Sequence, residues 1–196
     1  MDITNREQVE NATEDVIKIF GKIDILVNNA GVLKDNTIDN MTDDDWETVI
    51  DVNLKGSFLC TQAAQKYMKQ QQYGKIVMVS SLAAAGSRGR VNYASAKAGV
   101  QGMTKALAIE LGPYGINVNA VAPGFIDTDM SEVSRASAKI RGIENFDEFK
   151  QAFIQKNPIR RVGKPEDVAG VIAFLASREA DYVTGQVIYV TGSPVG

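Results

Sequence analysis

The stretch Ile23-Asp24-Ile25-Leu26-Val27-Asn28-Asn29-Ala30-Gly31 holds a short apolar run that ends abruptly in polar and small residues. Residues 23–27 are apolar at nearly every position rather than at alternate positions. This pattern is typical of a strand in a parallel sheet, because such a strand is buried on both faces. The Asn-Asn-Ala-Gly that follows predicts a loop at the carboxyl end of this strand.

Three further apolar runs follow along the chain, and segments with helical periodicity separate them. The expected strands are residues 23–27, 75–80, 116–121 and 186–190, and the expected helices are residues 5–20, 42–70, 93–111 and 165–177. Strands that alternate with helices indicate a parallel sheet covered on both faces. We therefore expect a single Rossmann-like domain over residues 1–196, a doubly wound α/β fold with about four strands. Ligands bind at the carboxyl ends of the strands in such sheets.

The composition excludes several classes of protein and of site. The 196 residues carry a net charge of −3 and have no apolar run of the roughly 18 residues that a membrane span needs, so we expect neither nucleic-acid nor membrane binding. There is no histidine, and Cys60 is the one cysteine, which excludes Ser-His-Asp triads, internal disulfides and His or Cys metal sites. We expect no metal, a cytoplasmic location, and acid–base chemistry by Tyr, Lys, Asp, Glu or a cofactor.

The segment Tyr93-Ala94-Ser95-Ala96-Lys97 places a phenol and an ammonium group four residues apart on an expected helix, which Asn92 is expected to cap. Residues at this spacing lie on one helix face, about 5–6 Å apart. At an effective dielectric near 20 the attraction is about 3 kcal/mol, which lowers the pKa of a tyrosine by about 2 units. The tyrosine then exchanges protons with an alcohol or carbonyl oxygen near neutral pH. Taken alone, the same spacing also fits an ordinary amphipathic pair.

Four other motifs occur in a definite order around this pair. The set is Asn28–Gly31 after a strand, Asn53 inside the next helix, Ser80-Ser81 at a strand end, Tyr93 with Lys97, and Pro123-Gly124 followed by Thr128. The order and approximate spacing of these motifs resemble those of the short-chain dehydrogenase/reductase family, over about residues 2–192. The resemblance implies a nicotinamide-dependent oxidoreductase.

The resemblance assigns catalytic roles to four residues. Tyr93 is implied to give a proton to the substrate carbonyl oxygen, and Lys97 to lower its pKa and hydrogen-bond the nicotinamide ribose. Ser81 is implied to hold and polarise the carbonyl. Ser80 is the alternative, because it lies 13 residues before Tyr93, the usual family spacing, whereas Ser81 lies at 12. Asn53 is implied to fix a water that links Lys97 to solvent, although a helix-interior Asn taken alone is more simply a solvent-facing residue.

The resemblance also implies contacts with NAD or NADP, between which the sequence does not choose. Asp2 and Ile3 match the pair that reads the adenine ring, although Asp2 also fits an exposed terminal acid. Asn29, Ala30 and Gly31 are implied to line a ribose. Pro123 and Gly124 come before Ile126 and Thr128, which are implied to meet the nicotinamide carboxamide, although the Pro-Gly pair taken alone is a simple turn.

Within the family, residues 92–99 and 121–130 resemble 3-oxoacyl-(acyl-carrier-protein) reductases. This implies reduction of a 3-oxoacyl thioester-like carbonyl to a hydroxyl, or the reverse reaction. Residues 125–160 are expected to form a substrate lid, with short helices near residues 132–141 and 146–155. At the end of this segment, the basic pair Arg160-Arg161 either meets a phosphopantetheine or a carrier protein or forms a solvated turn.

The family's first turn carries a glycine-rich Thr-Gly-x-x-x-Gly-x-Gly motif, which this sequence does not contain. About 55–60 residues that would cradle the pyrophosphate are therefore expected to be missing, by the size of two βαβ units. The strand at residues 23–27 is then expected to be an exposed apolar edge. Our hypothesis is that the chain is a fragment that binds cofactor weakly. The alternative function is a truncated, non-catalytic chain that associates with intact subunits, and a homo-oligomer is expected through helices 42–70 and 93–112.

Overall fold

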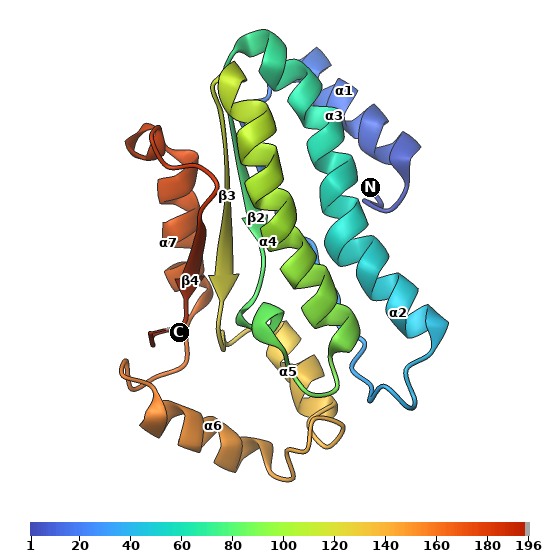
Figure 1. Ribbon diagram of the computed structural model, residues 1–196, viewed down its shortest axis with the longest axis vertical. Helices are drawn as coiled ribbons and strands as arrows, with labels where there is room; N and C mark the ends of the chain where they lie inside the picture. Colours follow the sequence, from blue (N-terminus) through green and yellow to red (C-terminus); the bar gives the residue numbers. More distant parts are fainter. Residues whose placement is uncertain (195–196) are drawn as a thin grey trace.

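A computed structural model of the chain describes residues 1–194. Its centre is a parallel four-stranded sheet in the order β1-β2-β3-β4, so that neighbours in sequence are also neighbours in the sheet. The strands are β1 (Ile25–Asn28), β2 (Gly74–Val79), β3 (Ile116–Pro123) and β4 (Val187–Val190). Helices connect them and cover both faces, which confirms the Rossmann-like α/β fold expected from the alternating pattern (Figure 1).

One face of the sheet is covered by two long helices, α3 (Gly56–Gln71) and α4 (Val91–Leu111) (Figure 1). The largest apolar cluster lies beneath them. Its fully buried side chains include Met68, Ile76, Met78, Val100, Leu111, Ile116 and Val118. Because Ile76 and Met78 alternate with Val77 along β2, Val77 points to the opposite face of the sheet.

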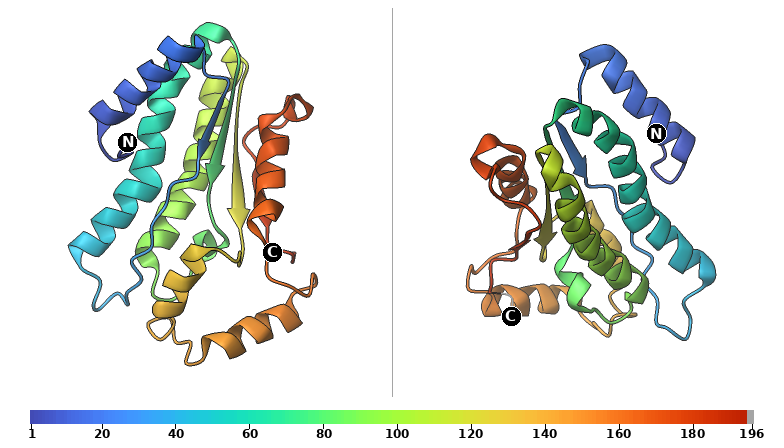
Figure 2. Two further views of the ribbon diagram at one scale, coloured as in Figure 1. Left: turned by 180° about the vertical axis from the view of Figure 1, so that it is seen from behind. Right: turned by 45° about the horizontal axis from the view of Figure 1, so that its top comes forward.

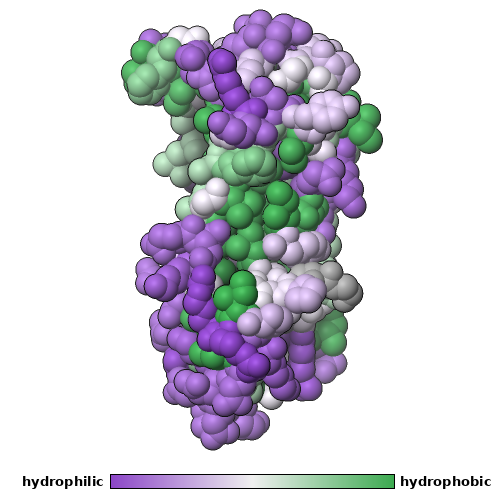
Figure 3. Space-filling model, turned by 90° about the vertical axis from the view of Figure 1, so that its left-hand side faces the viewer, coloured by the Kyte–Doolittle hydropathy of each residue, from purple (hydrophilic) through white to green (hydrophobic). Residues whose placement is uncertain are grey.

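The other face is covered by α7 (Pro165–Ala176), which packs Val168 and Leu175 against Val77 and Val121. The outer side of this helix contributes to an apolar surface, seen in the middle of the face shown in Figure 3. No helix of residues 1–194 is long and apolar enough to cross a membrane.

Strand β1 is an edge of the sheet in the described part of the chain, and α7 does not cover it. Ile25 and Val27 lie in register with Lys75 and Val77 of β2, on the face that α7 covers elsewhere. Their exposed fractions are 48% and 40%. The expectation that residues 23–27 are buried on both faces is therefore wrong for this face, whereas the expected exposed apolar edge is present.

Helix α1 (Arg6–Phe20) does not contact the sheet and packs instead on the outer side of α3, through Val9 (Figure 2). The Asn5 side chain caps its first turn by accepting a hydrogen bond from the Gln8 backbone. Gly21 ends it in a left-handed conformation with φ +76°, which a glycine adopts without strain.

The helix expected over residues 42–70 is present but is not a single α-helix. It consists of α2 (Asp43–Ile50), a π-helical turn over Asp51–Lys55 and α3. A capping box between Thr42 and Asp45 starts α2. The π turn adds a residue to one turn of the helix, which turns Asn53 inward so that it is completely buried.

Helix α4 begins at Val91, two residues before the expected start, so the prediction that Asn92 caps it is wrong. Asn92 lies inside the first turn and is fully buried. Its side chain donates hydrogen bonds to the backbone carbonyls of Lys34 and Asp45, each at 2.9 Å. Asn92 therefore ties the start of α4 to the loop after β1 and to α2.

Below the carboxyl ends of the strands lie two shorter helices, α5 (Asp129–Ala136) and α6 (Phe146–Lys156) (Figure 1). Three single 3₁₀ turns complete the fold, at Leu82–Ala85, Gly112–Tyr114 and Arg178–Ala180. Helices were expected near residues 132–141 and 146–155, so α5 begins earlier and ends earlier than predicted. The expected lid region, residues 125–160, thus contains both helices.

Candidate active site

A cleft of about 1000 Å³ opens at the carboxyl ends of the strands, where the topology predicts a ligand site. Its lining includes most of the residues that the motifs single out, which are Asn29, Ala30, Gly31, Ser80, Ser81, Tyr93, Lys97, Pro123, Gly124, Ile126 and Thr128. We call the side made by the end of β2 and the start of α4 the catalytic wall. The side made by residues 125–153 is called the lid wall.

Tyr93 and Lys97 lie on the cleft side of α4, with exposed fractions of 7% and 3%. The Lys97 Nζ atom is 5.6 Å from the centre of the Tyr93 ring, close to the separation that the helical spacing predicts. Lys97 Nζ also donates a hydrogen bond of 2.8 Å to the carbonyl of Val79, at the end of β2. Helix and strand therefore fix the ammonium group between them.

Burial governs the pKa values of this pair. It lowers the pKa of the Lys97 ammonium to about 8, because the charged form loses water. Burial also raises the pKa of the Tyr93 phenol, and a hydrogen bond with Ser81 and the charge of Arg90 oppose this only in part. The expectation that the pKa of Tyr93 lies below its ordinary value is therefore wrong for the protein alone, because desolvation outweighs the groups that lower it.

The two candidate serines point in different directions, as neighbours at a strand end do. Ser80 is 2% exposed, and its hydroxyl donates a 2.9 Å hydrogen bond to the Lys97 carbonyl and accepts one from Gln101. The Ser81 hydroxyl lies beside the Tyr93 phenol and accepts a 3.1 Å hydrogen bond from the Ala83 backbone. This placement favours Ser81 as the serine that a substrate carbonyl meets.

Asn53 lies behind the cleft rather than in its lining. Its amide nitrogen donates hydrogen bonds of 3.0 Å to the carbonyls of Val32 and Val49. Its Oδ1 atom is buried and has no donor among residues 1–194. A Cβ atom on Gly31 would come within 2.7 Å of this oxygen and 3.6 Å of Lys97 Nζ. Glycine at this position thus lets the Asn53 and Lys97 side chains approach the same point.

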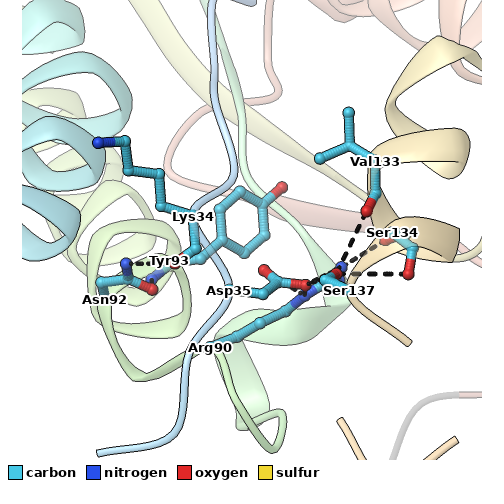
Figure 4. A network of polar contacts seen from close by, with 8 residues as sticks. All are labelled: Lys34, Asp35, Arg90, Asn92, Tyr93, Val133, Ser134 and Ser137. Atoms are coloured by element: carbon cyan, nitrogen blue, oxygen red, sulfur yellow. Dashed lines mark hydrogen bonds and ion pairs between the residues drawn. The ribbon is translucent and has the colours of Figure 1, made fainter. Parts of the chain in front are cut away.

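A buried ion pair lies at the floor of the cleft (Figure 4). Arg90, which precedes α4, donates from Nε to both carboxylate oxygens of Asp35, at 3.0 and 2.9 Å. The Asp35 side chain is 1% exposed. Ser137 donates a 2.6 Å hydrogen bond to Asp35, and Arg90 also donates to Ser134. The pair therefore connects the catalytic wall to the segment at the end of α5.

The lid wall is largely aromatic. Phe125 packs edge-on against Phe146 and Phe153, with ring centres 5.9 and 5.4 Å apart, and lies 6.3 Å from Phe149. All four rings line the cleft, together with the partly buried Arg141. One face of α6 carries Phe146, Phe149 and Phe153. Their spacing in the sequence was the pattern that could have indicated an aromatic helix face. Arg90, Asp35 and Arg141 had no motif to indicate them.

The basic pair Arg160-Arg161 is not part of the cleft lining. Arg161 forms a two-point ion pair with Asp167 at the start of α7, at 2.6 and 2.8 Å. Arg160 donates to the backbone carbonyl of Gln155. These contacts favour the solvated-turn interpretation of the pair.

Asp2 and Ile3 are not brought to the cleft. The Asp2 carboxylate is exposed and accepts hydrogen bonds from the backbone and hydroxyl of Thr4, at 2.9 and 2.8 Å. These bonds lower its pKa. The Ile3 side chain packs with Val9 against α3, over Gly56. Adenine recognition by this pair therefore stays a prediction.

The residues of the cleft fit the nicotinamide–ribose part of a dinucleotide. The buried Lys97 ammonium and the Tyr93 hydroxyl suit ribose hydroxyls, which both donate and accept hydrogen bonds. Beyond them, the backbone at Pro123–Gly124 and the side chain of Thr128 offer polar groups to a carboxamide. Asn29–Gly31 line the cleft beside the end of β1.

Known proteins resemble this chain over nearly its whole length. The model of the enoyl-(acyl carrier protein) reductase family matches residues 1–192. The 3-oxoacyl-(acyl-carrier-protein) reductase of Thermotoga maritima is 46% identical over 196 residues, which are 100% of this chain and 75% of that protein. Subunit BbsD of a (2S)-((R)-hydroxy(phenyl)methyl)succinyl-CoA dehydrogenase from Thauera aromatica is 44% identical over 97% of this chain and 73% of its own length.

A solved structure shares the fold as well as the sequence. The crystal structure of levodione reductase superimposes with a TM-score of 0.89 at 37% identity, over 97% of this chain and 74% of that one. The family match, these relatives and the cleft geometry agree with one another. The chain belongs to the short-chain dehydrogenase/reductase family, whose members are oxidoreductases that use NAD or NADP.

Proposed function

We propose that the protein reduces the 3-oxo group of an acyl thioester to a hydroxyl, or catalyses the reverse reaction, with NAD or NADP as cofactor. The observation that carries this proposal is the meeting of Ser81, Tyr93 and Lys97 in one cleft at the carboxyl ends of the strands. The Thermotoga maritima relative, named as a 3-oxoacyl-(acyl-carrier-protein) reductase, supports the choice of substrate.

The proposed mechanism assigns a different task to each side chain. When bound, a reduced nicotinamide supplies the hydride. Tyr93 donates the proton that the substrate oxygen needs, and its raised pKa keeps the phenol protonated at neutral pH. Ser81, beside the phenol, donates a second hydrogen bond to the same oxygen and so stabilises the negative charge that develops there.

Lys97 is proposed to support the tyrosine rather than to touch the substrate. With a pKa of about 8, its amine is mostly protonated at pH 7 and holds positive charge near the phenol. That charge favours the phenolate left after proton donation. The buried Asn53 Oδ1, which lies near Lys97 across Gly31, is an acceptor suited to a water that returns the proton.

The catalytic test compares Tyr93→Phe with wild type. Absorbance of the reduced cofactor during reduction of 3-oxohexanoyl-CoA should show kcat lowered by about 10²–10⁴-fold, the range for loss of a general acid. Cofactor binding, measured by fluorescence titration, should change little, because one hydroxyl is removed. Tyr114→Phe is the matched control, since Tyr114 is 38% exposed and does not line the cleft. Normal turnover in Tyr93→Phe removes Tyr93 from the mechanism.

We also propose a homo-oligomer that uses helices α2, α3 and α4. Trp46, Phe58 and Ile109 lie on these helices with exposed fractions of 39%, 42% and 79%, and apolar side chains of this size gain from burial in an interface. Sedimentation of Ile109→Glu should show dissociation to smaller species. An unchanged sedimentation coefficient contradicts this interface.

A further inference from the structure

Arg141 is a charged group in the cleft for which the proposed reaction has no use. It follows α5 and lines the same cleft as Tyr93 and the aromatic lid wall. It is partly buried. Its guanidinium forms no ion pair and no side-chain hydrogen bond within residues 1–194, whereas Arg135 of α5 pairs with Glu132 and Asp147.

The surroundings of Arg141 make its positive charge costly. Burial lowers its pKa first, and the neighbouring charge of Arg90 lowers it further. Asp35, the nearby carboxylate, attracts Arg141 more weakly, and its oxygens already accept hydrogen bonds from Arg90 and Ser137. Asp35 is therefore paired with Arg90, and Arg141 has no carboxylate partner within residues 1–194.

The remaining acid of the cleft lining does not neutralise this charge. Asp129, in the first turn of α5, forms no ion pair with Arg90 or Arg141 and is not among the groups that affect the pKa of Arg141. One positive charge at this end of the cleft is thus left uncompensated. An anion bound there both replaces lost hydration and relieves the repulsion between the two arginines.

We propose that Arg141 binds an anionic group of the substrate, at a distance from the reacting carbonyl, while the rings of Phe125, Phe146, Phe149 and Phe153 hold an apolar part. The proposal rests on the function proposed above and narrows its substrate class. Arg141 is thus a specificity residue. Two sources offer the anion, namely a carboxylate on the acyl chain and a phosphate of the thioester carrier.

The test separates these sources with three thioesters. The 3-oxohexanoyl and 3-oxoadipyl thioesters of N-acetylcysteamine have the same chain length but end in a methyl and a carboxylate, respectively. The third, 3-oxohexanoyl-CoA, adds phosphates without a carboxylate. Values of kcat/KM are measured for wild type, Arg141→Gln and Arg88→Gln. Arg88 is the matched control, because it is exposed and faces a separate depression beside Asn36.

Arg141→Gln should lower kcat/KM by about ten- to hundredfold for the substrate that carries the recognised anion, the range for a hydrogen bond to a charged group. It should change kcat/KM by less than about threefold for the neutral thioester. If kcat/KM falls for the 3-oxoadipyl thioester alone, the anion that Arg141 recognises is a carboxylate. If kcat/KM falls for the CoA thioester alone, that anion is a phosphate. Equal loss for all three substrates, or no loss, overturns the proposal.

A binding measurement separates this proposal from the proposed function. If wild type reduces none of the thioesters, the proposed function fails, and calorimetric titration with 3-hydroxyadipate and with CoA tests the anion site by itself. Binding of either probe that is weakened in Arg141→Gln and kept in Arg88→Gln supports the site. Binding that is equal in the three proteins, or absent from all of them, overturns it.

Discussion

The two walls of the cleft differ in how deeply some of their side chains are buried. The catalytic wall is part of the core: Tyr93 and Lys97 are 7% and 3% exposed, and the Lys97 ammonium is hydrogen-bonded to the end of β2. In the lid wall, Met130 and Phe149 are 38% and 37% exposed. Groups that need fixed distances for proton transfer thus lie where packing is tight. Phe149, which is proposed to help select the substrate, lies where side chains are partly exposed and less tightly packed.

One buried contact joins the two walls. Asp35 and Arg90 belong to the catalytic side, and Ser134 and Ser137 reach them from the end of α5 (Figure 4). The contact holds the end of α5 beside the residue that precedes α4. The predictions below test how far each wall depends on it and on its own packing.

The largest expected effect comes from Asp35→Asn, which leaves the Arg90 guanidinium buried without its carboxylate. The free energy of unfolding should fall by about 3–5 kcal/mol, measured by urea denaturation. Limited proteolysis should also cut residues 125–160 faster than in wild type. Asp167→Asn is the control, because it breaks an exposed ion pair with Arg161 and should cost about 0–1 kcal/mol. Equal losses in the two variants contradict a special role of the buried pair.

The next effect distinguishes two neighbours on the catalytic wall. Ser81→Ala removes the proposed second donor to the substrate oxygen and should lower kcat by about 10²–10³-fold. Ser80→Ala removes the hydroxyl that donates to the Lys97 carbonyl, so it should cost about 1 kcal/mol of stability with kcat nearly unchanged. Steady-state kinetics and urea denaturation of both variants measure the two effects. The opposite pattern makes Ser80 the substrate contact.

The catalytic wall could be predicted from sequence far better than the lid wall. Apolar runs predicted the strands, and Asn29, Ser81 and Pro123 were placed at their carboxyl ends, because the topology of a parallel sheet brings those ends together. The pKa of Tyr93 was not predictable from spacing, since the balance between burial and attraction depends on the depth of the cleft.

No comparable rule predicted the lid wall from the sequence. The contact between Asp35 and Arg90 joins residues 55 positions apart, and no pattern in the sequence marks it. The spacing of Phe146, Phe149 and Phe153 fits any amphipathic helix, so only the structure shows that these rings face a cleft. The sequence pattern also did not predict the exposure of Ile25, because an apolar run does not show whether helices cover both faces of the strand.

A third prediction concerns the buried ammonium of the catalytic wall. The pKa of Lys97 is about 8 in the folded protein and about 10.4 in an unfolded chain. Between these pKa values the unfolded chain binds more protons than the folded protein does, so this residue makes stability rise with pH. Below pH 8 the destabilisation caused by the buried ammonium is fully present. Relative to Lys97→Met, wild type should gain about 3 kcal/mol between pH 7 and pH 10.5.

Urea denaturation at several pH values measures this difference, and effects of other titrating groups cancel between the two proteins. Lys55→Met is the control for the substitution itself, because Lys55 is 52% exposed. A difference between wild type and Lys97→Met that does not change with pH means that the ammonium is better solvated than its 3% exposure indicates.

The smallest expected effect tests the lid wall alone. Phe149→Ala removes one partly exposed ring from the cleft, so stability should fall by less than about 1 kcal/mol. The KM for 3-oxohexanoyl-CoA should rise about five- to tenfold, since the end of the acyl chain loses apolar contact, and the KM for acetoacetyl-CoA should change less than about twofold. Phe20→Ala, on α1 and outside the cleft lining, is the control and should leave both values unchanged. If KM rises equally for both substrates, the ring orders the cleft as a whole. The proposed division, in which the catalytic wall carries the reaction and the lid wall selects the substrate, is then wrong.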